Sequence, residues 1–396
     1  MIRVLNKFTR IMKRIFYWGK SMLLAIKKNI KETVGEKTIP QMEPWFDEAE
    51  GLALYYYMKN NRYDFSANSE LEKRLADYTG AAYATLSVNG TFTLTLALLA
   101  LDLKPGDEVL VPAFTMIATP NSCLLVGIKP VLVDIEPQTL CMDMEKAAKS
   151  ITPKTKAMIY VPLNGRSGNM DSVVKFAKDH NLFLIEDAAQ ALGSYWQGKH
   201  LGTFGDIGSF SFSIPKIITT GQGGALITDN KAFHEKISLL KNFGQTSQQD
   251  IHDYIGWNFK FSNILAVVGI EQFKKLPWRV KRRKEIFKRY YENLRHIPEI
   301  EFIKTDPEST TLWCIDIFVP EPEKLADFLK KQNINTRLCY PAINTQKIYR
   351  QEYTGKSFPI AEHYSSRGLW LPSATQLSDK EIDYITGNIK EFYSSK

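Results

Sequence analysis

Short apolar segments bounded by turn-forming residues recur along the first two-thirds of the chain, and helix-length stretches separate several of them. The strand-like segments lie at 108–114, 129–135, 156–163, 182–187, 208–213 and 224–228, and the helix-like stretches include 91–101, 143–150 and 170–180. Strand, helix and strand at this spacing are typical of an α/β domain whose sheet is covered on both faces. The pattern therefore predicts a mainly parallel α/β fold.

The chain has 396 residues, more than one hydrophobic core usually serves, so we expect two unequal domains. Beyond residue 270 the pattern changes to a basic helix over 273–294, followed by shorter strand and helix segments. We predict a large domain over 38–270 and a smaller C-terminal α/β domain over 271–396. The basic run at 281–284 is interpreted as a solvated helix face.

The formal net charge of +8 is carried by the N-terminal segment. Residues 1–31 contain nine Lys and Arg and no acid, so the rest of the chain sums to about −1 (8 − 9). A near-neutral body has no obvious surface that tracks phosphates, which argues against nucleic-acid binding.

The same segment, taken as 1–37, has apolar residues at helical spacing with cations between them, which predicts a basic amphipathic N-terminal extension. Its apolar runs are broken too often for a transmembrane span or a signal peptide. Two interpretations stay open. In the first, residues 1–31 lie on an anionic lipid surface. In the second, the helix docks on the rest of the protein or on a second subunit.

Four cysteines, Cys123, Cys141, Cys314 and Cys339, lie far apart and form no C-x-x-C pair. This spacing predicts neither a disulfide framework nor a metal site, and it fits a reducing compartment. We therefore expect a cytoplasmic protein, peripheral at the inner face of a membrane if the lipid interpretation of the extension holds.

Two segments at predicted strand ends carry binding chemistry, because ligands of open α/β sheets bind beyond the carboxyl ends of the strands. Gly90 and Thr91 open a helix, where free N–H groups and a hydroxyl would seat a phosphate, although such a turn is more often only a helix cap. Asp187 ends an apolar strand and needs a cation or a donor as its partner, unless it caps the next helix.

A third segment contains Lys216, which follows the strand-like run that includes Ser211 and precedes a glycine-rich turn. A lysine amine held near apolar groups and another positive centre loses proton affinity and becomes a usable nucleophile toward an aldehyde. Pyridoxal 5′-phosphate (PLP) needs a lysine, a carboxylate for its ring nitrogen and a phosphate cradle together. The three segments therefore predict a PLP site.

From about residue 39 to its end, the chain resembles the PLP-dependent sugar-nucleotide aminotransferases of the DegT/DnrJ/StrS family. The matching motifs are NGT at 89–91, PGDEVLVPAFT at 105–115, PVLVDI at 130–135, ITPKTKAMI at 151–159, IEDAAQALGS at 185–194, GTFGDIGSFSF at 202–212, TTGQGGALIT at 219–228, GWNFKFSNI at 256–264 and RGLWLPS at 367–373. The resemblance implies the aspartate aminotransferase-like fold (fold type I). The motifs TTGQGG and SRGLWLPS are most similar to members that aminate C4 of a 4-keto-6-deoxyhexose, such as GDP-perosamine synthases.

The resemblance also implies roles for individual residues. Lys216 would join the cofactor's aldehyde and later move a proton, Asp187 would pair with the ring nitrogen, and Gln190 would lie near the ring hydroxyl. The remaining cofactor-binding residues would be Gly90, Thr91, Met116, Ser211 and Asn258. Asn258 would reach the phosphate from the partner subunit, so a homodimer with shared active sites is expected. Arg337 and Tyr340 would contact the substrate.

Several positions depart from the family pattern. Met116 stands where many members carry an aromatic ring, residues 162–166 replace the usual His-Leu-Tyr-Gly run, Gln222 replaces a glutamate, and Lys260 replaces a common arginine. A thioether can still cover a cofactor ring. We expect these departures to affect substrate fit more than the lysine chemistry.

The resemblance implies transfer of an amino group from L-glutamate to a nucleotide-linked ketosugar, in the biosynthesis of a surface glycan such as the O-antigen of lipopolysaccharide. Two alternatives stay open. Sugar dehydratases of the same fold have histidine at the lysine position, which Lys216 disfavours. The other alternative is a non-catalytic, regulatory or membrane-associated member of the family.

Overall fold

The computed structural model describes residues 37–60, 66–246, 248 and 250–394. The predicted N-terminal helix lies outside the described residues, so it stays a prediction. Within the described ranges, none of the helices has both the length and the apolar character that a membrane span requires. All four cysteines are buried and free.

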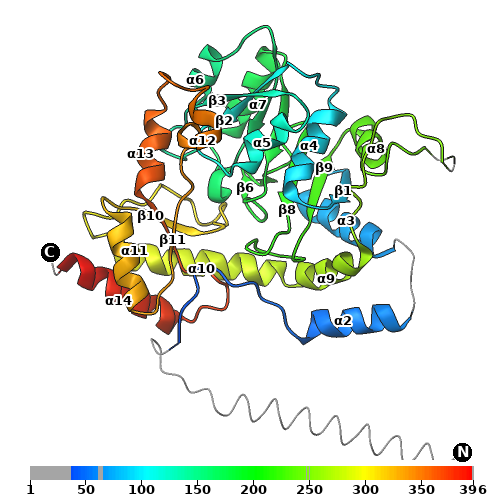
Figure 1. Ribbon diagram of the computed structural model, residues 1–396. Helices are drawn as coiled ribbons and strands as arrows, with labels where there is room; N and C mark the ends of the chain where they lie inside the picture. The colour runs from blue at the N-terminus through cyan, green and yellow to red at the C-terminus, as the bar shows by residue number, and fades with distance from the viewer. Residues whose placement is uncertain (1–36, 61–65, 247, 249, 395–396) are drawn as a thin grey trace, which may run out of the picture.

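A seven-stranded sheet forms the centre of the larger part of the molecule (Figure 1). Its strands are β1 (Tyr83–Ser87), β2 (Glu108–Pro112), β3 (Lys129–Val133), β4 (Thr155–Tyr160), β5 (Phe183–Asp187), β8 (Ile207–Ser211) and β9 (Gly224–Thr228), in the order β1-β9-β8-β5-β4-β2-β3. Every strand except β9 runs in one direction. The predicted α/β fold with a mainly parallel sheet is confirmed.

Each of the six predicted apolar segments overlaps one of these strands, whereas β1 was not predicted. Its five residues, YATLS, include only two aliphatic side chains that reach the core, Ala84 and Leu86. The reversal of β9 was also not predicted. The chain between β8 and β9 contains no helix, so it returns along the sheet as an antiparallel neighbour rather than crossing over. That helix-free connection carries Lys216.

Helices cover both faces of the sheet, and alternate strand residues enter different cores. Val109 and Val111 belong to one core and Leu110, between them, to the other. The helices of this part are α2 (Glu48–Lys59), α3 (Ser66–Thr79), α4 (Gly90–Ala100), α5 (Ala118–Leu124), α6 (Met144–Lys149), α7 (Met170–Asp179), α8 (Lys231–Leu240) and α9 (Asn263–Lys274), and a short hairpin joins β6 (Tyr195–Trp196) to β7 (Lys199–His200).

The predicted basic helix at 273–294 is divided in the structure. Helix α9 ends at Lys274, and α10 (Leu276–Leu294) begins after Lys275. Pro277 lies in the first turn of α10, where its missing N–H costs nothing, but it cannot continue a helix from the residues before it. The two helices follow one another below the sheet (Figure 1).

A second, three-stranded antiparallel sheet, β10-β12-β11, has its own core. Its part of the chain contains β10 (Ile315–Phe318), α11 (Pro322–Lys331), β11 (Arg337–Leu338), α12 (Lys347–Arg350), α13 (Pro359–Arg367), β12 (Gly368–Leu371) and α14 (Asp379–Ser394). The division into domains over 38–270 and 271–396 stays a proposal, because residue 271 lies within α9 and one core includes residues from both parts.

Two buried polar contacts join the two sheets. The guanidinium of Arg166 makes two hydrogen bonds, of 2.8 and 2.5 Å, with the carboxylate of Asp316 on β10. The side chain of Asn164 bonds the N–H and the carbonyl of Cys314, both at 2.7 Å. Residues 162–166 therefore fasten one sheet to the other.

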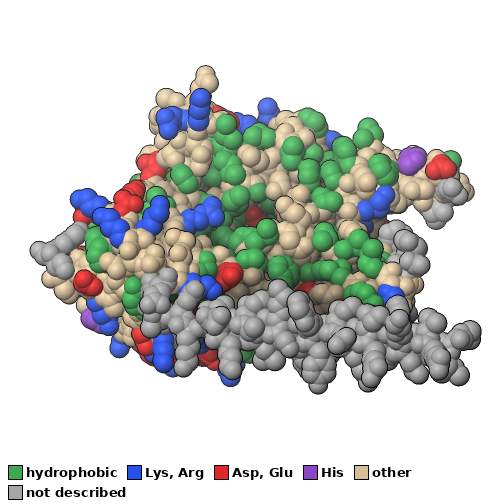
Figure 2. All heavy atoms as spheres, turned by 60° about the horizontal axis from the view of Figure 1, so that its bottom comes forward, with side chains coloured by type: hydrophobic (Ala, Val, Ile, Leu, Met, Phe, Trp, Pro, Cys, Tyr) green, Lys and Arg blue, Asp and Glu red, His purple; other side chains and the backbone are tan. Residues whose placement is uncertain are grey.

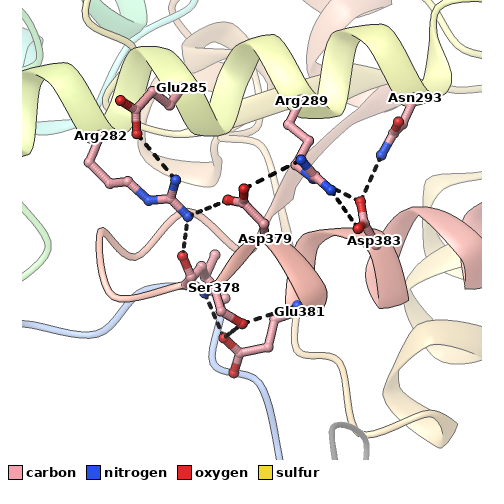
Figure 3. Close-up of polar contacts among 9 residues, drawn as sticks. Arg282, Glu285, Arg289, Asn293, Ser378, Asp379, Glu381 and Asp383 are labelled. Carbon is pink, nitrogen blue, oxygen red and sulfur yellow. Dashed lines mark hydrogen bonds and ion pairs between the residues drawn. The ribbon is translucent and has the colours of Figure 1, made fainter.

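Helix α14 attaches to α10 through charged side chains at the surface (Figure 3). Arg282 and Arg289 both bind Asp379, and Arg289 also binds Asp383 with N–O distances down to 2.6 Å. The interpretation of the run at 281–284 as a solvated face fits Lys281, whose side chain is 78% exposed. It is wrong for Arg283, which is 2% exposed and donates to the carbonyl of Trp313, because this side of α10 packs against the body of the protein.

Candidate active site

A pocket of about 320 Å³ lies where the parallel strands of the large sheet end. Nine of the ten site residues expected from the sequence line it, and they are Gly90, Thr91, Met116, Asp187, Gln190, Ser211, Lys216, Arg337 and Tyr340. The last two come from the smaller sheet's part of the chain, so both parts form the walls.

The N-terminus of α4 forms one wall of the pocket. The side chain of Asn89 accepts a hydrogen bond from the N–H of Phe92 and caps the helix. A Cβ added to Gly90 would lie 2.9 Å from the Cβ of Ser211, so only glycine lets the helix start approach β8 this closely. The N-terminus of a helix together with the hydroxyls of Thr91 and Ser211 suits an anionic phosphate.

Asp187, the last residue of β5, lies across the pocket and is only 6% exposed. Its Oδ2 accepts a 2.7 Å hydrogen bond from Thr119, and its Oδ1 accepts one from the N–H of Ala189 at 3.3 Å. Burial raises the pKa of Asp187, while the Thr119 hydroxyl and the charge of Lys216 oppose that rise. The buried carboxylate can therefore accept a bond from a cationic N–H.

Glu186 points to the opposite face of β5, as the strand alternation predicts. Its carboxylate is buried and accepts hydrogen bonds from the N–H groups of Gly202, Phe204 and Gly205. It fastens the turn before β8 and does not line the pocket.

Lys216 lies in the connection after β8, partly buried on the pocket wall. Burial lowers the pKa of Lys216 to about 8, although the negative charge of Asp187 opposes the shift. Its Nζ lies 4.2 Å from the centre of the Trp313 ring. About a tenth of the amine is therefore neutral near pH 7, far more than for an ordinary lysine, and the neutral form is the one that acts as a nucleophile or a base.

Gln190 is fixed by its carbonyl oxygen, which accepts a 2.8 Å hydrogen bond from the N–H of Asn164. This contact presents its amide N–H₂ group as a donor toward the pocket. The bond to Gln190 comes from the backbone of Asn164, whereas the side chains of Asn164 and Arg166 take part in the contact between the two sheets. Arg166 is paired with Asp316 and does not line the pocket, and the expected effect of the departure at 162–166 on substrate fit stays a prediction.

The rim of the pocket contains Met116, Gln222, Arg337 and Tyr340. Met116 is 41% exposed, so its thioether is free to cover a ligand. The guanidinium of Arg337 lies over the rings of Tyr340 and Trp370, at 5.7 and 5.2 Å.

Asn258 is the expected site residue that does not line the pocket within this chain. It is exposed on the loop before α9, where it pairs with Asn242 as an isolated bridge. Its predicted role from a partner subunit stays a prediction. The neighbouring Lys260 donates to the side chain of Asn242 at 2.9 Å.

Sequence reasoning missed three residues that shape the site: Thr119, Asn164 and Trp313. Thr119 follows Thr115 by one helical turn beside a recognised motif, and this spacing was a usable signal. Asn164 and Trp313 act across the contact between the two sheets, for which the sequence contains no local signal.

The residues of the pocket fit PLP. The Gly90 cradle leaves room that a Cβ would fill, Asp187 is a buried carboxylate that no cation neutralises by direct contact among the described residues, and Lys216 has a lowered pKa. These features match the phosphate, the ring nitrogen and the aldehyde of the cofactor.

Comparison with known proteins agrees with a PLP site in this pocket. Residues 53–390 match the sequence model of the DegT/DnrJ/EryC1/StrS aminotransferase family. GDP-perosamine synthase of Escherichia coli O157:H7 is 38% identical over 83% of this chain and 90% of its own length. GDP-perosamine synthase of Caulobacter vibrioides is 40% identical over 80% of this chain and 87% of its own.

A sugar aminotransferase structure from Streptococcus pneumoniae, in its PLP form, superposes with a TM-score of 0.83 at 27% identity, covering 90% of this chain and 99% of its own. The expected aspartate aminotransferase-like fold is confirmed. With the family match, the pocket and the fold in agreement, the chain belongs to the DegT/DnrJ/EryC1/StrS aminotransferase family and is a PLP-dependent sugar aminotransferase.

Proposed function

We propose that the protein transfers an amino group from L-glutamate to a nucleotide-linked 4-keto-6-deoxyhexose, for the biosynthesis of a surface glycan such as O-antigen. The convergence of Lys216, Asp187 and the N-terminus of α4 on one pocket carries the aminotransferase part of this proposal. The GDP-perosamine synthases among its relatives support the choice of sugar and of GDP as the nucleotide.

Each residue has a defined task in this scheme. Lys216 would hold the cofactor through its aldehyde and, when free, would carry the proton at the reacting carbon of the substrate. Asp187 would accept a hydrogen bond from the protonated ring nitrogen, and the N-terminus of α4 would hold the phosphate. Bound PLP supplies an electron-withdrawing ring that stabilises the negative charge developing at that carbon.

The test is spectroscopic and chemical. Purified protein is expected to be yellow, to lose the absorption band of the lysine-bound cofactor on addition of L-glutamate, and to regain it with GDP-4-keto-6-deoxymannose. Mass spectrometry should then detect the GDP-linked amino sugar. Recovery of the band only with dTDP- or UDP-linked ketosugars would reject the choice of GDP, and no response to glutamate would favour a non-catalytic role.

We also propose a homodimer whose active sites are shared through Asn258. Figure 2 shows hydrophobic side chains gathered over much of the described surface on the face it displays, around a hollow. Near Asn258, Ile255 is 85% exposed and Trp257 is also exposed, which is unusual for a monomer surface. Mixing inactive Lys216→Ala and Asn258→Ala subunits should restore activity, because one mixed site then has both residues. No recovery after subunit exchange would reject sharing.

The cytoplasmic location and a peripheral membrane contact through residues 1–31 are further proposals. Nine cations among apolar residues at helical spacing support binding to anionic lipid. In a flotation assay, the full chain should rise with anionic liposomes, whereas a Δ1–37 variant should stay at the bottom of the gradient. Equal flotation of the two proteins would reject the membrane contact.

A further inference from the structure

The indole of Trp313 makes two contacts with the segment that carries the reactive lysine. Its ring face lies 4.2 Å from Nζ of Lys216. Its Nε1–H donates a 2.6 Å hydrogen bond to the carbonyl of Pro215, the residue immediately before the lysine. One side chain from the other sheet's part of the chain therefore holds both the amine and the backbone of the Lys216 segment.

Trp313 is itself fixed from several sides. It is buried, and Trp370 packs against its ring edge-on with centroids 5.2 Å apart. Its own carbonyl accepts a 2.8 Å hydrogen bond from Arg283 of α10. The next residue, Cys314, is held through its N–H and carbonyl by Asn164. The indole therefore has little freedom to move away from the lysine.

The backbone after the lysine is fastened as well. The carbonyl of Ile217 accepts a 2.9 Å hydrogen bond from Arg279, one helical turn before Arg283 on α10. Carbonyls on both sides of Lys216 are thus held by groups that lie far away in the sequence. The connection between β8 and β9 contains no helix or strand of its own around Lys216, so these contacts supply the order that regular structure would otherwise give.

We propose that Trp313 is a positioning residue for Lys216: its ring face holds the amine and its indole N–H holds the backbone before it. The proposal rests on the proposed function only in taking Lys216 as the reacting amine. A ring face attracts an ammonium ion, so Trp313 gives the released lysine a defined resting place. The amine can then return to the same point in each half of the reaction.

The ring also affects the protonation of the amine. The titratable and charged groups around Lys216 are Asp187 at the end of β5, the thiol of Cys314, and Arg337 and Tyr340 across the pocket. Burial raises the pKa of Cys314 to about 12, so this thiol is neutral near pH 7. Asp187 and the Trp313 ring both favour the ammonium, against burial, which favours the neutral amine.

A series of fluorinated tryptophans at position 313 tests the ring contact. Added fluorine withdraws electrons from the ring face, weakens its attraction for a cation, and leaves its size and its N–H almost unchanged. The full chain, freed of cofactor, is reacted with pyridoxal across a pH range, and the product is trapped with borohydride. The modified Lys216 peptide is then quantified by mass spectrometry.

The rate at which pyridoxal modifies Lys216 should rise with pH around a midpoint near 8. This midpoint should fall stepwise as fluorine atoms are added to the ring of Trp313, by about 0.5 to 1 pH unit in total. Fluorinated tryptophans at the exposed position of Trp278 should leave the pH midpoint of Lys216 unchanged. Lys281, whose side chain is 78% exposed, reports direct effects of the reagent. A midpoint that stays constant along the series would overturn the role of the ring.

Trp313→Phe tests the second contact, since it keeps an aromatic face and removes the N–H. Amides of the 212–220 peptide should exchange hydrogen about five-fold faster, the ratio for one lost hydrogen bond of about 1 kcal/mol. Trp278→Phe is the matched control and should change nothing there. Unchanged exchange in Trp313→Phe would reject the backbone anchor. If glutamate still bleaches the cofactor band while neither effect occurs, only this inference fails; if glutamate has no effect, the proposed function fails.

Discussion

Arg279 and Arg283 lie on the buried face of α10. Arg282 and Arg289 instead point toward α14 (Figure 3). The buried pair donates to main-chain carbonyls, those of Ile217 and Trp313. The outer pair binds the carboxylates of α14. One helix therefore orders the active-site segment with one face and attaches the last helix of the chain with the other.

The two faces also differ in electrostatic cost. Burial lowers the pKa of Arg279 and of Arg283 to about 10. Asp383 raises the pKa of Arg289, whose side chain is 38% exposed. A charge that is buried with carbonyls as partners is costly, and its benefit is a fixed position. A charge paired at the surface costs little and contributes little.

The largest effect on stability is expected from Arg279→Met. Arg279 donates to Ile217, Gln272 and Trp45, and each acceptor would lose a charged partner worth about 1.5–3 kcal/mol. Removing the buried charge returns about 3 kcal/mol, the cost that its lowered pKa indicates. The free energy of unfolding should therefore fall by about 1.5–6 kcal/mol, measured by urea denaturation at one protein concentration.

The matched control for that experiment is Arg289→Met, the same substitution on the outer face of the same helix. Methionine keeps helix propensity similar, so the difference between the two variants reports the surroundings of the charge. Equal losses for the two variants would contradict the distinction between the faces.

A smaller effect of opposite sign is expected from Lys216→Met in the cofactor-free chain. The folded-state pKa of Lys216, about 8, lies below the usual 10.5, so the folded state releases its proton first as pH rises. Below pH 8 the wild type carries the full cost of a partly buried ammonium, and the variant should be more stable by about 1–2 kcal/mol after allowance for partial exposure. The gain should disappear between pH 8 and 10.5, as shown by urea denaturation at several pH values. A gain that is constant with pH would indicate better packing instead.

These contrasts also explain how far the sequence could lead. The strands containing Asp187 and Ser211 were predicted because an apolar run bounded by turn residues is a local signal, and Lys216 because it lies between such a run and a glycine-rich turn. The closeness of Gly90 to Ser211 follows from β1 and β8 ending at the same edge of the sheet, and β1 itself was missed. Trp313 and Arg279 reach the lysine segment through tertiary packing, where no short sequence pattern reports the contact.

The smallest effect is expected on the outer face. Arg289→Met removes bonds to Asp379 and Asp383, whose side chains are about half exposed, so the unfolding free energy should fall by less than about 1 kcal/mol. Because mobile ions screen exposed charges, this loss should shrink in 1 M NaCl, whereas the loss in Arg279→Met should persist there. The rate at which L-glutamate removes the cofactor band should be unchanged, since α14 does not line the pocket. A slower rate in Arg289→Met would mean that the outer network is coupled through α10 to the lysine segment, and the two faces would then act as one unit.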